Sequence, residues 1–186
     1  MINYEKYRLS RIVSVQEIVS ADYVKGLHPS SMYHSHDEAW ELCVCLAGET
    51  VVIRDCTQYM LSPGQILLIQ PGVGHDISIF SNTSSAFIVS FTCTNSDHLR
   101  PLRDAVIKAE KPQLELFQNM IVELDATFER SSGEIGPLHL FQFTPSEESP
   151  LGAEQMICCY LEQLLISLLR SATMSKGQVV RSGQFR

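Results

Sequence analysis

The stretch HSHDEAWELCVCLAG, residues 34–48, decides the fold of this chain. It places His34 and His36 two positions apart, so both imidazoles would point to the same side of an extended strand. Glu41 follows His36 at an odd spacing, which would put it on the opposite face of one uninterrupted strand. We therefore expect a turn or bulge at residues 37–39, after which Glu41 begins the next strand.

A second stretch, LSPGQILLIQPGVGH at residues 61–75, ends on a third histidine. The tight turn at residues 71–74 can deliver the His75 ring to the same pocket as the first two histidines. Three neutral imidazoles and one carboxylate suit Zn, Fe, Ni, Mn or Cu and leave open positions for water or a ligand. The alternative is a polar wall without metal, in which two histidines bond to Glu41 and His75 braces its turn.

The chain between residues 32 and 92 consists of short β-rich runs that are separated by turn residues. The runs cover residues 42–47, 50–54, 58–61, 66–69, 77–80 and 86–92. Several short strands separated by turn signals are typical of an antiparallel sandwich or barrel. We expect residues 28–95 to form this barrel and residues 1–27 to form an N-terminal arm that packs on it.

The apolar pattern changes to helical spacing after the barrel, first at residues 114–128 and then at about residues 153–171. A polar loop that includes Pro145 separates the two predicted helices. The second helix is apolar around most of its circumference, so it would pack on two neighbours such as the barrel and a second subunit. The alternative is that both helices simply cover the barrel. Residues 96–172 form this helical extension.

The charge balance argues against nucleic-acid binding by this chain alone. The net charge is −7, with 6 Lys and Arg against 10 Asp and Glu in residues 1–100, and 8 against 11 in residues 101–186. Neither half offers the basic face that phosphate neutralisation requires. The N-terminal MINYEKYRLSRIV lacks the apolar core of a secretory signal, and no apolar run is long enough to cross a bilayer. We expect a cytoplasmic protein without a membrane segment.

The six cysteines contain no C-x-x-C pair. Cys43 and Cys45 would share one face of a strand, and Cys158 and Cys159 fall in the second predicted helix. We interpret the cysteines as reduced thiols that pack as small apolar side chains, with soft-metal or redox chemistry as the alternative.

The first stretch resembles the first motif of the cupin family. The pattern His34-x-His36-x4-Glu41-x6-Gly48 matches every spacing of that motif after its opening glycine. Gly26 lies two residues farther upstream than the motif places this glycine. In cupin metalloenzymes the matching histidines and glutamate are metal ligands.

The second stretch resembles the second cupin motif over residues 64–75. It departs from the motif at Gln70, where proline is usual, and at Ile79, where asparagine is expected. Two motifs in this order, with about 15 residues between them, imply a cupin fold. That fold is mostly β, a double-stranded β-helix or jelly-roll barrel, followed in this chain by two α-helices.

The plan of the whole chain is similar to the effector-sensing domain of AraC-type transcription regulators. In that family the cupin pocket often keeps its histidines while it binds a sugar or another small effector, and two helices supply dimer contacts. The resemblance implies a non-enzymatic sensor that binds a small-molecule effector and forms a homodimer through its C-terminal helices. Residues 173–186 would be a linker toward a DNA-binding domain with two helix-turn-helix motifs, which this chain lacks.

The resemblance also implies a site that serves a divalent transition metal (Zn, Ni, Fe or Mn) and an effector. The residues that it assigns to both roles are His34, His36, Glu41 and His75. Trp40 beside them would suit stacking against a sugar ring. Two alternatives remain open. One is a metal-dependent cupin enzyme, a dioxygenase or sugar isomerase, that recruits Tyr59 and Glu49 as acid and base; the other is a purely structural dimerisation module.

Overall fold

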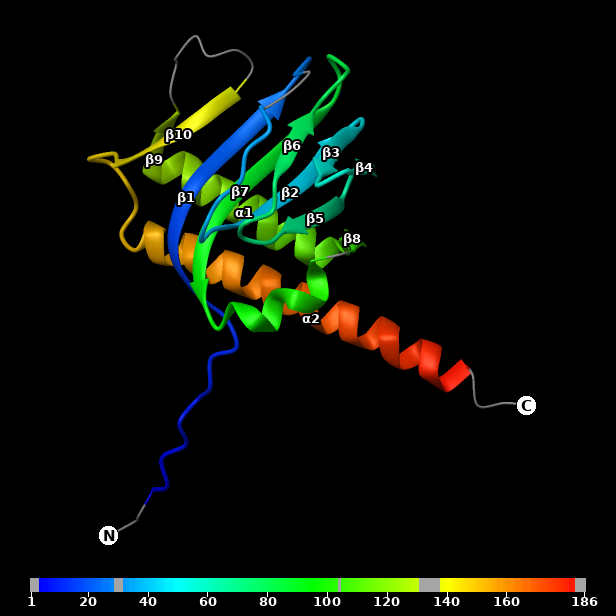
Figure 1. The fold of residues 1–186 in the computed structure, drawn as a ribbon. Helices are drawn as coiled ribbons and strands as arrows, with labels where there is room; N and C mark the ends of the chain where they lie inside the picture. The colour runs from blue at the N-terminus through cyan, green and yellow to red at the C-terminus, as the bar shows by residue number, and fades with distance from the viewer. Residues whose placement is uncertain (1–3, 29–31, 104, 131–137, 183–186) are drawn as a thin grey trace.

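Strands dominate the chain, and two long helices lie in its C-terminal part (Figure 1). The structure is a computed structural model that describes residues 4–28, 32–103, 105–130 and 138–182. Its strands are β1 (Ser14–Lys25), β2 (Trp40–Ala47), β3 (Thr50–Arg54), β4 (Thr57–Leu61), β5 (Gln65–Ile69), β6 (His75–Ser78), β7 (Ser85–Thr94), β8 (Val106–Lys108), β9 (Phe128–Arg130) and β10 (Leu138–Pro145). Its helices are the 3-10 helix η1 (Ser96–Leu102) and the α-helices α1 (Lys111–Thr127) and α2 (Ala153–Ser182).

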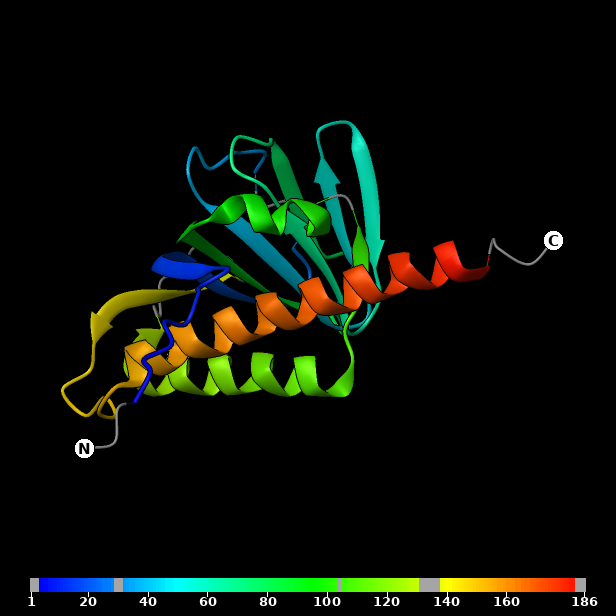
Figure 2. The ribbon, with the colours of Figure 1, turned by 90° about the horizontal axis from the view of Figure 1, so that it is seen from below.

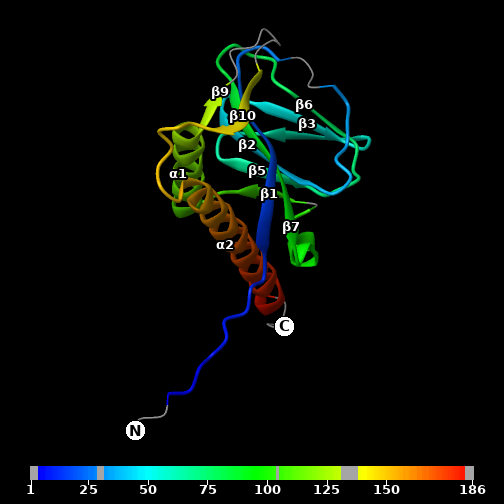
Figure 3. The ribbon, with the colours of Figure 1, turned by 90° about the vertical axis from the view of Figure 1, so that its left-hand side faces the viewer.

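The strands form two antiparallel sheets that pack on each other. The larger sheet has the strand order β8-β5-β2-β7-β1-β10-β9, and the smaller has the order β4-β3-β6. Figure 3 shows the smaller sheet on one side of the larger sheet and the two α-helices on the other side. The prediction of a mostly β barrel followed by two helices is confirmed.

Each face of the larger sheet buries its own apolar cluster, because successive side chains of a strand point to opposite faces. The inner cluster lies between the two sheets and contains Cys43 and Cys45 of β2. The outer cluster contains Leu42 and Val44 of the same strand and packs against α1 and α2. Burial raises the pKa of the Cys43 thiol, so this side chain stays protonated and packs as an apolar group.

Helices α1 and α2 lie side by side across the outer face of the larger sheet (Figure 2). The apolar side chains that α2 buries there are Ile157, Leu161, Leu164, Leu165 and Leu168. The buried Gln113 amide of α1 donates hydrogen bonds to Ser167 at 3.2 Å and Ser171 at 3.0 Å. By length and composition alone, Ala153–Thr173 could cross a membrane. Part of the apolar character of this segment belongs to the side chains that α2 packs on the sheet and on α1.

The region expected to be an N-terminal arm is divided between an exposed segment and a full strand. Residues 4–12 are exposed and lie outside both sheets (Figure 1). Residues 14–25 form β1, which lies inside the larger sheet between β7 and β10, so the prediction of an arm is wrong for this part. Two register irregularities within residues 15–20 interrupt the alternation of β1. They hide the strand pattern from a reading of the sequence.

Two further differences lie after the barrel. The segment expected to be a polar loop contains β10, which extends the larger sheet beside β1, and β9 forms where the first helix was expected to end. The second helix was expected to end near residue 171, before a linker at residues 173–186, but α2 continues to Ser182. A helix needs an apolar face only where it packs, because each added residue gains a backbone hydrogen bond once the helix is nucleated.

Candidate metal centre

Four side chains with metal-ligating atoms converge in the structure: His34, His36, Glu41 and His75. The backbones of His34 and His75 form a bridge, in which each N–H donates to the other carbonyl at 3.0 and 2.8 Å. The chain then bends at residues 37–38, and β2 begins directly before Glu41. The predicted turn between His36 and Glu41 is therefore confirmed, and it brings the carboxylate to the same side as the histidines.

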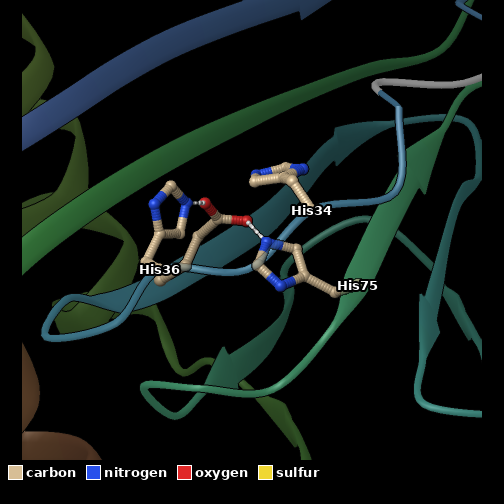
Figure 4. A group of neighbouring side chains, drawn as sticks. His34, His36 and His75 are labelled. Atoms are coloured by element: carbon tan, nitrogen blue, oxygen red, sulfur yellow. Dashed lines mark hydrogen bonds and ion pairs between the residues drawn. The ribbon is translucent and has the colours of Figure 1, made fainter.

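The four potential ligand atoms lie within 4.8 Å of one another. Figure 4 shows the rings of His34, His36 and His75 gathered around one point. Ligand atoms that share one bound ion lie about 3–4 Å apart, so a small contraction would close this group on a metal. Glu41 and His75 are buried whereas His34 is exposed, so the group opens to solvent on the His34 side.

Glu41 lies at the centre of the contacts. Its Oε2 accepts a hydrogen bond from Ser90 Oγ at 2.8 Å and lies 3.0 Å from His36 Nε2. Its Oε1 lies 3.0 Å from His75 Nε2. Both atoms are buried, and apart from each other they have no hydrogen-bond partner among the residues that the structure describes. A polar wall without metal would explain the His36 contact, but a cation between the two atoms would also satisfy this pair.

Backbone carbonyls orient two of the rings. His34 Nδ1 lies 2.8 Å from the Met32 carbonyl oxygen, and His75 Nδ1 lies 2.9 Å from that of Val73. A carbonyl oxygen only accepts, so each Nδ1 carries the hydrogen and each neutral ring keeps a lone pair on Nε2. Such contacts fix the tautomer of histidine ligands in metal sites. The donor set therefore fits a divalent transition metal such as Zn, Ni, Fe or Mn.

The pKa values of Glu41 and His75 shift in opposite directions. Burial acts to raise the pKa of Glu41, but its contacts with His36, His75 and Ser90 outweigh burial and hold the pKa well below its usual range. Burial acts to lower the pKa of His75, but the adjacent Glu41 carboxylate outweighs it, and the pKa lies above its usual value. Without metal, the pair therefore favours a carboxylate and an imidazolium.

Metal affinity is expected to rise with pH and to keep rising above about pH 6.5, the ordinary pKa of histidine. The raised pKa of His75 keeps its ring protonated to higher pH, and a protonated ring cannot bind metal. Without metal, the stability of the protein should instead fall as the pH rises. The raised pKa of His75 stabilises the fold fully below about pH 6.5, and this contribution is lost as the pH rises through the pKa of the folded state. Melting curves with and without Zn(II) between pH 6 and 8 check this. An increase in melting temperature on adding Zn(II) that is the same at pH 6 and at pH 8 would contradict it.

A pocket of about 280 Å³ opens beside the four residues. Its polar lining consists of Ser20, Asp22, His34, His36 and Glu41, and its other lining residues are Met32, Tyr33, Ile77 and Ile88. Burial, followed by the charge of Glu41, raises the pKa of Asp22 to about 7 against an opposing effect of His36. Ser20 and Asp22 were not predicted as site residues, because the irregular register of β1 conceals which of its residues face the pocket.

Other residues considered for the site lie elsewhere. Trp40 is buried in the outer cluster, on the opposite face of β2 from Glu41. The prediction that it lines the effector pocket is wrong, because neighbouring residues of a strand point to opposite faces. The Tyr59 hydroxyl accepts a hydrogen bond from Arg54 at 2.7 Å, and Glu49 lines a separate hollow.

Residues 24–92 match the family profile described as "Cupin domain". The structure is similar to that of a cupin protein from Bacteroides fragilis, at 21% identity over 52% of this chain and 89% of that chain, with a TM-score of 0.36. It is also similar to a predicted oxalate decarboxylase from Thermotoga maritima, at 20% identity over 42% of this chain and 67% of that chain, with a TM-score of 0.35. No curated protein matches the chain.

The matched range contains β2 to β6, most of β7 and all four candidate metal ligands. It combines the two sequence motifs with the two-sheet barrel that brings their histidines and glutamate together. Residues 24–92 of this chain form a cupin domain.

Proposed function

We propose that this chain is the ligand-sensing domain of an AraC-type transcription regulator. Its cupin pocket binds a small effector beside a divalent transition metal. The proposal is carried by the way β1 connects the pocket to α2. Ser20 and Asp22 of β1 line the pocket, and at the start of the same strand the Val15 N–H donates to Glu162 Oε1 of α2 at 2.9 Å.

Strand β1 is suited to transmit a change from the pocket to the helices. Its register against β7 shifts between Val15 and Glu17 and again between Ile18 and Ser20. Both irregularities lie between the Glu162 contact and Asp22, where the ladder is locally disrupted. An effector that binds one arrangement of β1 better than another would shift the population toward it. The hydrogen bond at Val15 would then alter the packing of α2.

Helix α2 is the surface that we propose for homodimerisation. Apolar side chains remain partly or fully exposed beside its buried face, among them Met156, Tyr160 and Leu169. A second copy of α2 would cover them. The net charge of −7 leaves DNA binding to a separate domain of the regulator, which would act in the cytoplasm.

Effector binding is expected to slow amide hydrogen exchange in α2 as well as in the barrel. A melting-temperature screen of sugars, amino acids and divalent metals selects the probe. At 100 times its Kd, a ligand adds about 2.7 kcal/mol of stability, which corresponds to about 5–10 °C for a chain of this size. Hydrogen exchange with and without that probe then locates the response.

The variant Glu162→Ala removes the contact between β1 and α2. We expect the barrel of this variant to keep its response to the probe while the response of α2 is reduced. Glu154→Ala, which removes an exposed carboxylate from the same helix, is the matched control. Exchange that changes only in the wild-type barrel under saturating probe would count against a sensor.

A metal-dependent cupin enzyme, a dioxygenase or sugar isomerase, is the second candidate. The observation in its favour is Asp22, because a carboxyl group with a pKa of about 7 beside a metal centre suits proton transfer at neutral pH. Oxygen consumption or sugar isomerisation by metal-loaded protein would favour the enzyme, provided that Asp22→Asn abolishes turnover and retains the metal.

A further inference from the structure

Three neighbouring strands carry polar side chains in one row across the inner face of the larger sheet. Ser20 of β1 pairs with Ser90 of β7, and Ser90 pairs with Glu41 of β2. The side chains are hydrogen-bonded in the same order, since Ser20 Oγ donates to Ser90 Oγ at 3.0 Å and Ser90 Oγ donates to Glu41 Oε2 at 2.8 Å. A pocket ligand that contacts Ser20 is therefore two hydrogen bonds from a candidate metal ligand.

The carboxylate at one end fixes the direction of this chain of hydrogen bonds. Glu41 Oε2 is a carboxylate oxygen that lies 2.8 Å from Ser90 Oγ and 3.0 Å from His36 Nε2, and it serves as the acceptor for Ser90. Ser90 must therefore donate to Glu41 and accept from Ser20. Since the Ser20 hydroxyl has one hydrogen, which goes to Ser90, Ser20 can offer a pocket ligand only an acceptor.

Asp22 adds a second acceptor on the same strand. It lies two residues after Ser20 and therefore on the same face of β1, and it also lines the pocket. Its Oδ1 atom is buried, and no group in the described part of the chain forms a hydrogen bond with it. The neighbouring lining residues Ile77 and Ile88 have no polar side-chain atoms to offer it.

Packing alone does not explain a carboxyl group at this position. A buried polar atom without a hydrogen bond costs stability, and an apolar side chain would avoid that cost. The raised pKa of Asp22 has the same origin, because burial is its largest cause. At this pocket the buried atom left unsatisfied by the described residues is Asp22 Oδ1, since Glu41 Oε1 and His75 Nε2 lie 3.0 Å apart as an ion pair.

We propose that Ser20 and Asp22 form a recognition subsite for a hydrogen-bond donor, an ammonium or hydroxyl group, on a small ligand whose other end reaches the metal centre. The inference rests on the proposed ligand-binding function and specifies the chemistry that selects the ligand. Both groups present acceptors to the pocket when Asp22 is ionised, so a ligand with a donor at this end satisfies them and a ligand with an apolar end leaves Asp22 unpaired.

Matched small acids test the subsite in the Zn(II)-loaded protein. The probes are 3-aminopropionate and 3-hydroxypropionate against propionate, and 4-aminobutyrate and 4-hydroxybutyrate against butyrate. Calorimetry at pH 8, where Asp22 is mostly ionised, is expected to show at least one donor-bearing acid binding about 10-fold or more tightly than its parent. The paired lengths allow for the span between carboxylate and donor.

The variants assign the preference to Asp22 and identify the donor. Asp22→Ala should abolish the preference, whereas Asp22→Asn should keep a preference for hydroxyl and lose one for ammonium, which needs the charge. Glu17→Ala removes an exposed carboxylate from the same strand and should leave the preference intact. Binding of the parent acids without any donor preference, or a preference that persists in Asp22→Ala, would overturn the subsite and leave the pocket function standing. Failure of zinc and of every probe to bind would instead overturn the proposed function, and the subsite with it.

Discussion

Replacing His75 with alanine is expected to lower metal affinity by at least about 100-fold. Loss of an outer partner of a metal ligand typically costs 10–100-fold in affinity, and loss of a ligand costs at least as much. His75 contributes one of four converging donors, and its Nδ1 contact with Val73 already orients Nε2 toward Glu41. Competition of the protein with a chromophoric chelator for Zn(II) or Ni(II) measures the loss.

His75 is buried, and its removal also leaves Glu41 Oε1 without its ion-pair partner, so the variant could lose stability as well as metal. A second variant separates the two effects. His34→Ala removes an exposed ligand, so it should lower affinity while the metal-free melting temperature stays close to that of wild type. His98→Ala removes an exposed histidine outside the group and serves as the control. If the His75→Ala and His34→Ala variants retain full metal content, the four residues do not form a metal centre.

The barrel strands were predictable because their signals are local. The run at residues 50–54 is β3 as the structure has it, and the runs at 58–61 and 66–69 differ from β4 and β5 by one residue at one end. Turn residues bound these short strands on both sides. Strand β1 was not predictable in this way, because its two register irregularities depend on pairing with β7, which is distant in the sequence.

The distinction between local sequence signals and contacts of distant segments also applies to the site. Motif spacing located the four candidate ligands, and the turn before Glu41 followed from strand alternation. Alternation also places Trp40 on the opposite face of β2, so the stacking role expected for it conflicts with the reasoning that located Glu41. Asp22 was missed because it belongs to β1, whose place beside the pocket depends on pairing with β7, a strand that is distant from it in the sequence.

Gly48→Ala is expected to destabilise the barrel by about 2–5 kcal/mol, the sum of a backbone and a packing cost, and this explains physically why the motif ends on glycine. Gly48 has φ +62°, a left-handed conformation that costs a residue with a Cβ about 1–2 kcal/mol. An added Cβ would also overlap Ser84 Oγ and lie 2.9 Å from Ser84 Cα. Overpacking of this kind adds about 1–3 kcal/mol. Ser84 cannot turn aside freely, because its Oγ accepts the Glu49 N–H at 3.0 Å.

Gly72→Ala separates the two causes of this effect. Gly72 has φ +77°, yet a Cβ added there would meet no atom within 4 Å. It should therefore lose only the conformational part, about 1–2 kcal/mol, and the difference between the two variants measures the crowding by Ser84. Chemical denaturation of both variants gives the two free energies of unfolding. Equal losses would show that Ser84 does not exclude a side chain at Gly48, and that backbone conformation alone requires glycine at this end of the first motif.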